Sequence, residues 1–168
     1  MQKIITTSGF YNPIHEGHLN LFKEAKEFGD YLIVIVNNDL QVKLKGSTPF
    51  MNEQERLKII SAIKYVDFVF LSIDKDKTVR ETIKKVINII KKRETTEDDC
   101  GNKLYYSYSD MAINSKISLF ENPKIIFAKG GDSTWDNTPE KELLPTIFGV
   151  GGEKIQSSSW LKDKIKNE

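Results

Sequence analysis

Two histidines, His15 and His18, stand either side of Glu16-Gly17 directly after a short β-branched run. On the first turn of a helix, residues three apart share one side. Imidazole changes charge near neutral pH, and a nearby polyphosphate would favour its protonated form. It can also donate hydrogen bonds to oxygens whose negative charge grows in a transition state. Gly17 allows close approach to the backbone, and helix N-termini attract anions. The pattern predicts a compact anion site.

The same pair of histidines has two simpler interpretations, a surface turn and a pair of metal ligands. Protein zinc sites use three or four ligands, and this chain has only these two histidines and no cysteine near them. The single cysteine, Cys100, has no adjacent histidine or other base, which argues against a nucleophilic role. The position of the histidines after the first predicted strand favours ligand binding, because ligands bind at the carboxyl ends of parallel strands.

Apolar patterning predicts the elements that would position these histidines. Continuous apolar runs such as Leu32–Val36 suit strands that are buried on both faces, as in a parallel sheet. Helical stripes include Leu21–Phe28, Leu57–Ile63 and Val79–Ile90, and Asn52 with Glu55 forms a capping-box-like helix start. The alternation predicts a Rossmann-like, doubly wound α/β fold, a five-stranded parallel sheet with helices on both faces. The expected strands are Lys3–Ser8, Leu32–Val36, Val66–Leu71, Lys124–Phe127 and Thr146–Val150.

The length of 168 residues predicts a single domain over 1–168. A polar segment at about 93–122 breaks the strand–helix rhythm, and we interpret it as an insertion or long loop. It holds a tyrosine cluster that would cover the acceptor or bury a partner surface. A last helix is expected to open at Ser157.

Composition excludes several classes of protein. The net charge of +1 gives no overall basic field for nucleic acid or an anionic membrane. No run of about 18 apolar residues exists, so no membrane span is expected. The N-terminal residues do not form a signal-peptide pattern, and a lone cysteine cannot form an intramolecular disulfide. We therefore expect a cytoplasmic protein.

Several ordered motifs resemble the cytidylyltransferase-like nucleotidyltransferase superfamily, whose hallmark is the HxGH turn at His15–His18. The chain has a lysine-containing loop with a following NEEER-like helix start, an RYVD-like strand entry, a GD-containing loop and a serine-rich second signature. These stretches are Lys43–Gly46, Pro49–Arg56, Lys64–Asp67, Lys129–Asp132 and Ser157–Lys162. Together they cover most of the chain apart from the insertion.

The resemblance implies roles for the matching residues. His15 and His18 would contact a triphosphate and stabilise transfer of its α-phosphoryl group, and Lys43 or Lys45 would reach the phosphates or the incoming substrate. A second group would line the nucleotide pocket: Gly9, Phe10, Asn12, Gly17, Gly130, Asp132, Ser157, Ser158, Ser159 and Lys162. Asn12 stands where many members carry Asp. Mg²⁺ would bridge the triphosphate, and a homodimer is implied because relatives often form dimers.

The expected reaction is transfer of CMP from CTP to a phosphorylated small molecule, with release of pyrophosphate. Sugar, polyol and amino-alcohol phosphates are all open as acceptors. Two arginines of the cytidylyltransferase pattern are absent, since Lys64 replaces one and Gly151–Gln156 lacks the other, which Lys154 would have to replace. Lysine cannot reproduce a bidentate guanidinium fork. The Lys129–Asp132 stretch is also similar to the ATP-using domain that acts on heptose phosphate. An ATP-dependent adenylyltransferase is therefore the alternative.

Other classes of protein fit less well. An NAD-dependent oxidoreductase would need G-x-G-x-x-G after the first strand, which is absent. Class I aminoacyl-tRNA synthetases share an HxGH-type turn, but this chain lacks a KMSKS loop and their bulk. A non-catalytic nucleotide-binding protein stays open because of the missing arginine.

Overall fold

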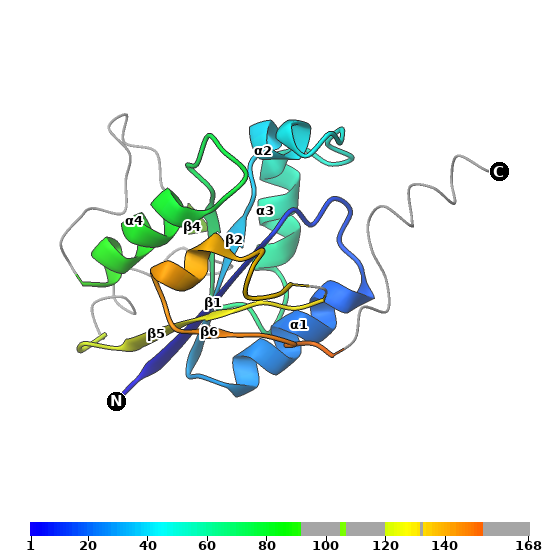
Figure 1. Cartoon of the computed structure of the whole chain (residues 1–168). Helices are drawn as coiled ribbons and strands as arrows, with labels where there is room; N and C mark the ends of the chain where they lie inside the picture. Colours follow the sequence, from blue (N-terminus) through cyan, green and yellow to red (C-terminus); the bar gives the residue numbers. More distant parts are fainter. Residues whose placement is uncertain (92–104, 107–119, 132, 153–168) are drawn as a thin grey trace.

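The computed structural model describes residues 1–91, 105–106, 120–131 and 133–152. Five parallel strands alternate with helices around one sheet, as the sequence predicts (Figure 1). The strand order is β4-β3-β2-β1-β5-β6. The strands are β1 (Lys3–Gly9), β2 (Tyr31–Val36), β3 (Phe68–Leu71), β4 (Tyr105–Tyr106), β5 (Lys124–Ala128) and β6 (Thr146–Ile147).

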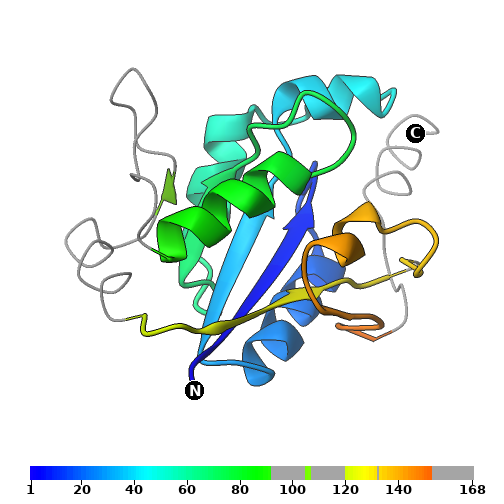
Figure 2. The ribbon, with the colours of Figure 1, turned by 60° about the vertical axis from the view of Figure 1, so that its left-hand side comes forward.

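Helices cover both faces of the sheet, which confirms the doubly wound arrangement (Figure 2). The helical elements are α1 (Glu16–Glu27), α2 (Asp39–Leu44), α3 (Glu53–Ser61), α4 (Arg80–Ile90) and the short 3₁₀ helix η1 (Pro139–Glu142). Residues of α1 and α3 pack with odd-numbered β1 residues such as Ile5, whereas residues of α4 pack with Ile4. The alternation of side chains along a strand thus divides the core into two layers.

The structure differs from the expected elements in four places. The antiparallel edge strand β4 lies inside the segment expected to be a long loop. Helix α2 was not predicted, because Asn37-Asn38-Asp39 was interpreted only as a strand stop, whereas Asn38 accepts the Gln41 N–H and caps a helix. η1 was not predicted either. Two strands are shorter than expected, since β3 begins at Phe68 and β6 ends at Ile147.

Two expected structural signals are present. Asn52 accepts a hydrogen bond from the Glu55 backbone N–H, and the Glu55 carboxylate accepts one from the Asn52 N–H, so the predicted capping box starts α3. Asp67 of the RYVD-like stretch joins two elements, because its carboxylate accepts from Leu32 N–H and from Lys26 Nζ. Across the described ranges, none of the helices combines the length and apolarity that crossing a bilayer requires.

Candidate functional site

The two histidines meet where the carboxyl end of β1 leads into α1. His15 is the N-cap residue of α1, and its carbonyl accepts the His18 backbone N–H at 2.9 Å. The two rings stack with their centroids 3.7 Å apart and an interplanar angle of 24°. The His15 backbone N–H donates to His18 Nδ1 at 3.2 Å. Because Nδ1 accepts, a neutral His18 ring carries its proton on Nε2, which leaves that N–H as a donor.

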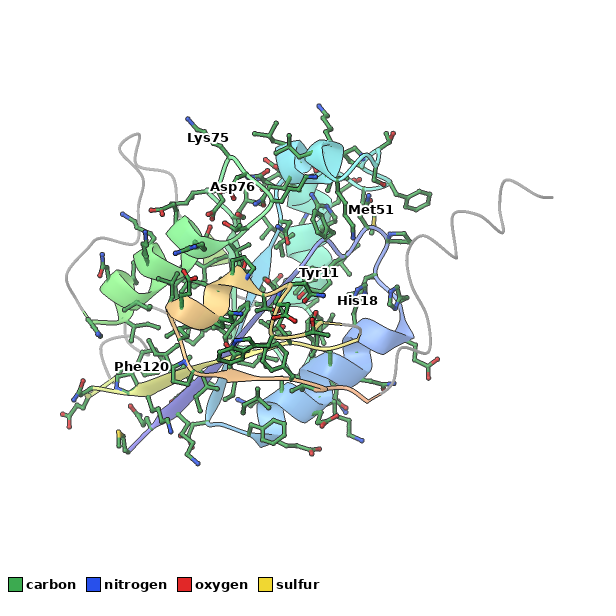
Figure 3. All side chains as sticks on the ribbon, viewed as in Figure 1. Tyr11, His18, Met51, Lys75, Asp76 and Phe120 are labelled. Carbon is green, nitrogen blue, oxygen red and sulfur yellow. The ribbon has the colours of Figure 1, made fainter. Side chains whose placement is uncertain are left out.

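Tyr11 supports the His18 ring from below. Its buried ring meets His18 edge-on with centroids 4.9 Å apart, and it also packs on Phe22 of α1 (Figure 3). Burial raises the pKa of the Tyr11 phenol, so this group stays neutral. A Cβ at Gly9 would lie 2.7 Å from the Tyr11 ring, so glycine is needed here for close packing. Contact between Gly9 and a nucleotide stays a prediction.

His18 is neutral in this environment. Burial, then the neighbouring His15, then Lys45 lower the pKa of His18 to about 3. The Lys45 Nζ lies 4.4 Å from the centre of the Phe10 ring, which holds the ammonium near the histidines. The sequence-based expectation of a protonated imidazole therefore applies only when an anion is bound.

The structure separates the two candidate lysines. Lys45 is the C-cap residue of α2 and acts electrostatically on His18. Lys43 lies in the last turn of α2 with an exposed side chain, and it is absent from the causes of the His18 pKa shift. The geometry brings Lys45, but not Lys43, to the histidine pair.

Asn12 holds a neighbouring loop. Its amide donates to the Thr48 carbonyl at 2.9 Å, and its oxygen accepts from the backbone N–H groups of Phe50 and Met51 at 2.5 and 3.4 Å. The side chain is buried, so it fixes the turn that follows α2 to the turn that follows β1. This is a positioning role, and direct contact with a nucleotide stays a prediction.

Arg56 is a buried anchor for the loops around the site. Sequence reasoning weighed a surface salt bridge against substrate contact, and the structure shows neither, because the residue is 1% exposed. Its guanidinium donates to the carbonyls of Phe10 and Asn37 at 2.7 and 2.6 Å. It also donates to the Met51 carbonyl and to Asp39. No pattern in the sequence distinguishes such an anchor from an exposed arginine.

Lys129 is a site residue that sequence reasoning missed, although it begins the quoted Lys129–Asp132 stretch. It follows β5, which pairs with β1, and its Nζ donates to the Ser8 hydroxyl at 3.4 Å. Burial lowers the pKa of Lys129 while the Glu140 carboxylate opposes this, and Lys45 lowers it further. The amine therefore lies within electrostatic reach of Lys45, at the carboxyl edge of the sheet where ligands bind.

The remaining predicted nucleotide-binding residues divide into two groups. Gly17 lies in the first turn of α1, where a backbone N–H points toward the histidine end. Gly130 is needed for packing, since a Cβ there would lie 2.5 Å from the Val150 carbonyl oxygen. The others lie outside the described residues: Asp132, Ser157, Ser158, Ser159 and Lys162.

The chemistry of the described side chains does not fit a metal site built by the protein. Within those residues, no group of three His, Cys, Asp or Glu side chains converges on one point. Mg²⁺ prefers oxygen ligands in octahedral geometry, whereas the groups beside His18 are imidazoles and amines. The expected Mg²⁺ would have to be held by phosphate oxygens of the nucleotide.

The fold and this site define a class of protein, an α/β nucleotide-binding domain with a histidine pair at its first strand–helix turn. A family model described as cytidylyltransferase-like matches residues 6–140. The chain therefore belongs to the cytidylyltransferase-like family, and as a member it is a nucleotidyltransferase.

Relatives of known name agree with this class. The FAD synthase of Thermoplasma acidophilum is 32% identical over 115 residues, which cover 67% of this chain and 78% of that protein. The bifunctional protein HldE of Desulfatibacillum aliphaticivorans is 47% identical over 70 residues, or 40% of this chain. The aligned region spans only 14% of HldE. HldE's full activity therefore cannot be transferred to this chain as a finding.

Solved structures support the fold. A bifunctional NMN adenylyltransferase/ADP ribose pyrophosphatase from Francisella tularensis superposes with a TM-score of 0.60 at 15% identity, covering 99% of this chain and 42% of that one. A lipopolysaccharide core biosynthesis protein from Thermoplasma volcanium gives a TM-score of 0.55 at 22% identity, covering 89% and 97%.

Proposed function

We propose that this protein is an adenylyltransferase that transfers AMP from ATP to a phosphorylated small molecule and releases pyrophosphate. The observation that carries the proposal is the stacked His15–His18 pair at the N-terminus of α1, with Lys45 beside it. Two hydrogen-bonding rings, a helix N-terminus and an ammonium form a set of groups suited to a polyphosphate.

The preference for ATP over the initially expected CTP rests on two observations. The relative with the broadest match quoted above is a FAD synthase, whose product contains an adenylyl group. The chain also lacks both arginines of the cytidylyltransferase pattern, and the lysine in one of those positions cannot form a bidentate fork. CTP is the alternative nucleotide, and its use is tested in the same experiment.

The proposed chemistry is a direct in-line displacement. A phosphate oxygen of the acceptor attacks the α-phosphorus of ATP, a new P–O bond forms, and the bond to pyrophosphate breaks. The attacking phosphate is already ionised, so no strong general base is required. The site would act by positioning the reactants and stabilising charge.

His18 would donate from Nε2 to an oxygen of the α-phosphoryl group, because its Nδ1 already accepts the His15 backbone N–H. His15 would donate beside it, and Lys45 would offset the growing negative charge. Tyr11 and Phe10 would hold these groups in place through the ring contacts. Mg²⁺, if required, would arrive bound to the triphosphate.

The test is pyrophosphate release, measured separately with ATP and CTP against a panel of phosphorylated sugars, polyols, amino alcohols and flavin mononucleotide. Release with ATP at least tenfold faster than with CTP supports the proposal. Faster release with CTP restores the cytidylyltransferase. Tight nucleotide binding without release, across the whole panel, indicates a non-catalytic nucleotide-binding protein.

The homodimer and the cytoplasmic location also stay proposals. Light scattering of the purified protein measures the first, and a monomer at working concentration would contradict it. Fractionation of cells that express the protein measures the second, and recovery outside the cytoplasm would contradict it.

A further inference from the structure

Glu140 presents a buried carboxylate oxygen that the surrounding protein does not satisfy. The residue lies in η1 and is 4% exposed. Its Oε1 accepts the Val79 backbone N–H at 3.1 Å, where α4 begins. Its Oε2 has no hydrogen-bond partner among the described residues. A buried charged oxygen without a partner is costly, so such an oxygen calls for an explanation.

Lys129 is the charged group that acts on Glu140 most directly. Within the described part of the chain the two side chains do not form an ion pair with each other. The ammonium has three donors, and its one hydrogen bond to a described residue is the long contact with Ser8. A buried base and a buried acid thus lie within electrostatic reach of each other, each with spare hydrogen-bonding capacity.

The hydroxyl-bearing residues of β1 extend this polar cluster. Thr6 and Ser8 alternate with Thr7 along the strand, so they share the face that also carries Ile4 and is covered by α4. The Thr6 hydroxyl is buried and has no hydrogen-bond partner in the described structure. The histidine pair begins α1, which covers the opposite face. Lys45 acts electrostatically on both His18 and Lys129.

We propose that Lys129 and Glu140 bind neighbouring hydroxyl groups of a polyhydroxylated acceptor, whose phosphate lies near Lys45 and the histidines. The inference rests on the proposed nucleotidyl transfer and names the class of acceptor. A hydroxyl both accepts and donates, so one hydroxyl accepts from Lys129 and the next donates to Glu140 Oε2. A second phosphate would be repelled by Glu140, and an ammonium would be repelled by Lys129.

The acceptor class is tested by binding, which does not require turnover. Calorimetry on the full chain, with a non-hydrolysable ATP analogue present, compares hydroxylated and bare phosphates of similar size. Glucose 1-phosphate and mannose 1-phosphate are compared with cyclohexyl phosphate, and glycerol 3-phosphate with propyl phosphate. We expect at least one hydroxylated phosphate to bind at least about tenfold more tightly than its bare counterpart, because a site built to bind hydroxyl groups rejects analogues that lack them. Equal binding within each comparison, or no binding of any probe, overturns the inference.

Variants assign the preference to the two side chains. Glu140→Gln and Lys129→Gln should each reduce the preference for the hydroxylated phosphate by about tenfold, since each removes a charged partner of a hydroxyl. Binding of the ATP analogue should be unchanged in Glu140→Gln. Glu142→Gln is the matched control, because Glu142 lies in the same 3₁₀ helix with an exposed side chain and should keep the full preference. An unchanged preference in folded Glu140→Gln overturns the assignment.

Failure of this inference is distinguishable from failure of the proposed function. If nucleotidyl transfer is wrong, no acceptor releases pyrophosphate, while the binding comparison still reports whether hydroxyl groups are recognised. If the inference is wrong, pyrophosphate is released with acceptors regardless of their hydroxyl groups, and Glu140→Gln leaves the acceptor KM unchanged.

Discussion

The guanidinium of Arg56 lies 2.6 Å from the Asp39 carboxylate, with the arginine side chain fully buried and the aspartate side chain 28% exposed. The pair joins α3 to the first residue of α2. The same guanidinium also binds the carbonyl of Phe10, whose ring contacts Lys45. Arg56 therefore sets the position of Lys45 relative to the histidines without touching a ligand.

Loss of this anchor should destabilise the fold. Arg56→Met leaves three carbonyls and Asp39 without their partner, and breaking a buried ion pair typically costs about 3–5 kcal/mol. Urea denaturation of the variant measures the free energy of unfolding. Arg80→Met is the control, because Arg80 pairs with Glu142 at the surface and should cost less than about 1 kcal/mol. Equal costs for the two variants would contradict the anchoring role.

The histidines should dominate turnover. His15→Ala and His18→Ala should each lower the rate of pyrophosphate release by at least about a hundredfold, the scale of a lost oxyanion donor near 3 kcal/mol. The circular dichroism spectrum should remain that of a folded α/β protein. Wild-type turnover in both variants would refute the proposed role.

Stability should fall in mild acid because His18 is buried in its neutral form. Its folded pKa is about 3, below the ordinary value of 6.5, so between these values the unfolded chain binds a proton that the folded chain does not. The contribution is fully present above about pH 6.5 and is lost as the pH falls towards 3. At pH 5 the loss from this group reaches about 2 kcal/mol.

His18→Gln isolates that contribution, since glutamine has no titration in this range. Urea denaturation at pH 7 and pH 5 should show a smaller loss of stability in the variant than in the wild type. The same loss in both proteins would mean that His18 is charged in the folded state.

The two lysines of the α2 region should differ in effect. Lys45→Met removes an ammonium that acts on His18 and should lower kcat/KM at least about tenfold, consistent with loss of one charge at the phosphates. Lys43→Met is the matched control, because its side chain is exposed on the helix and should leave kcat/KM near wild type. Steady-state pyrophosphate release measures both, and the reverse order would contradict the geometry.

The sequence by itself determined the layered fold and the location of the site. Runs such as Leu32–Val36 can be satisfied only between two helical layers, and the alternation of strands with amphipathic helices leaves little choice of topology. The spacing of His15 and His18 after the first strand was enough to place them together at the start of a helix. These are local properties, and the sequence pattern therefore carries them.

Only the tertiary structure decided which polar groups join the histidines. It selected Lys45 over Lys43, added Lys129, buried Arg56 as an anchor and left Glu140 with an unsatisfied oxygen. These relationships join residues as far apart as Ser8 and Lys129. Burial and charge at such positions depend on how distant segments pack, and residue type together with local spacing does not specify that packing.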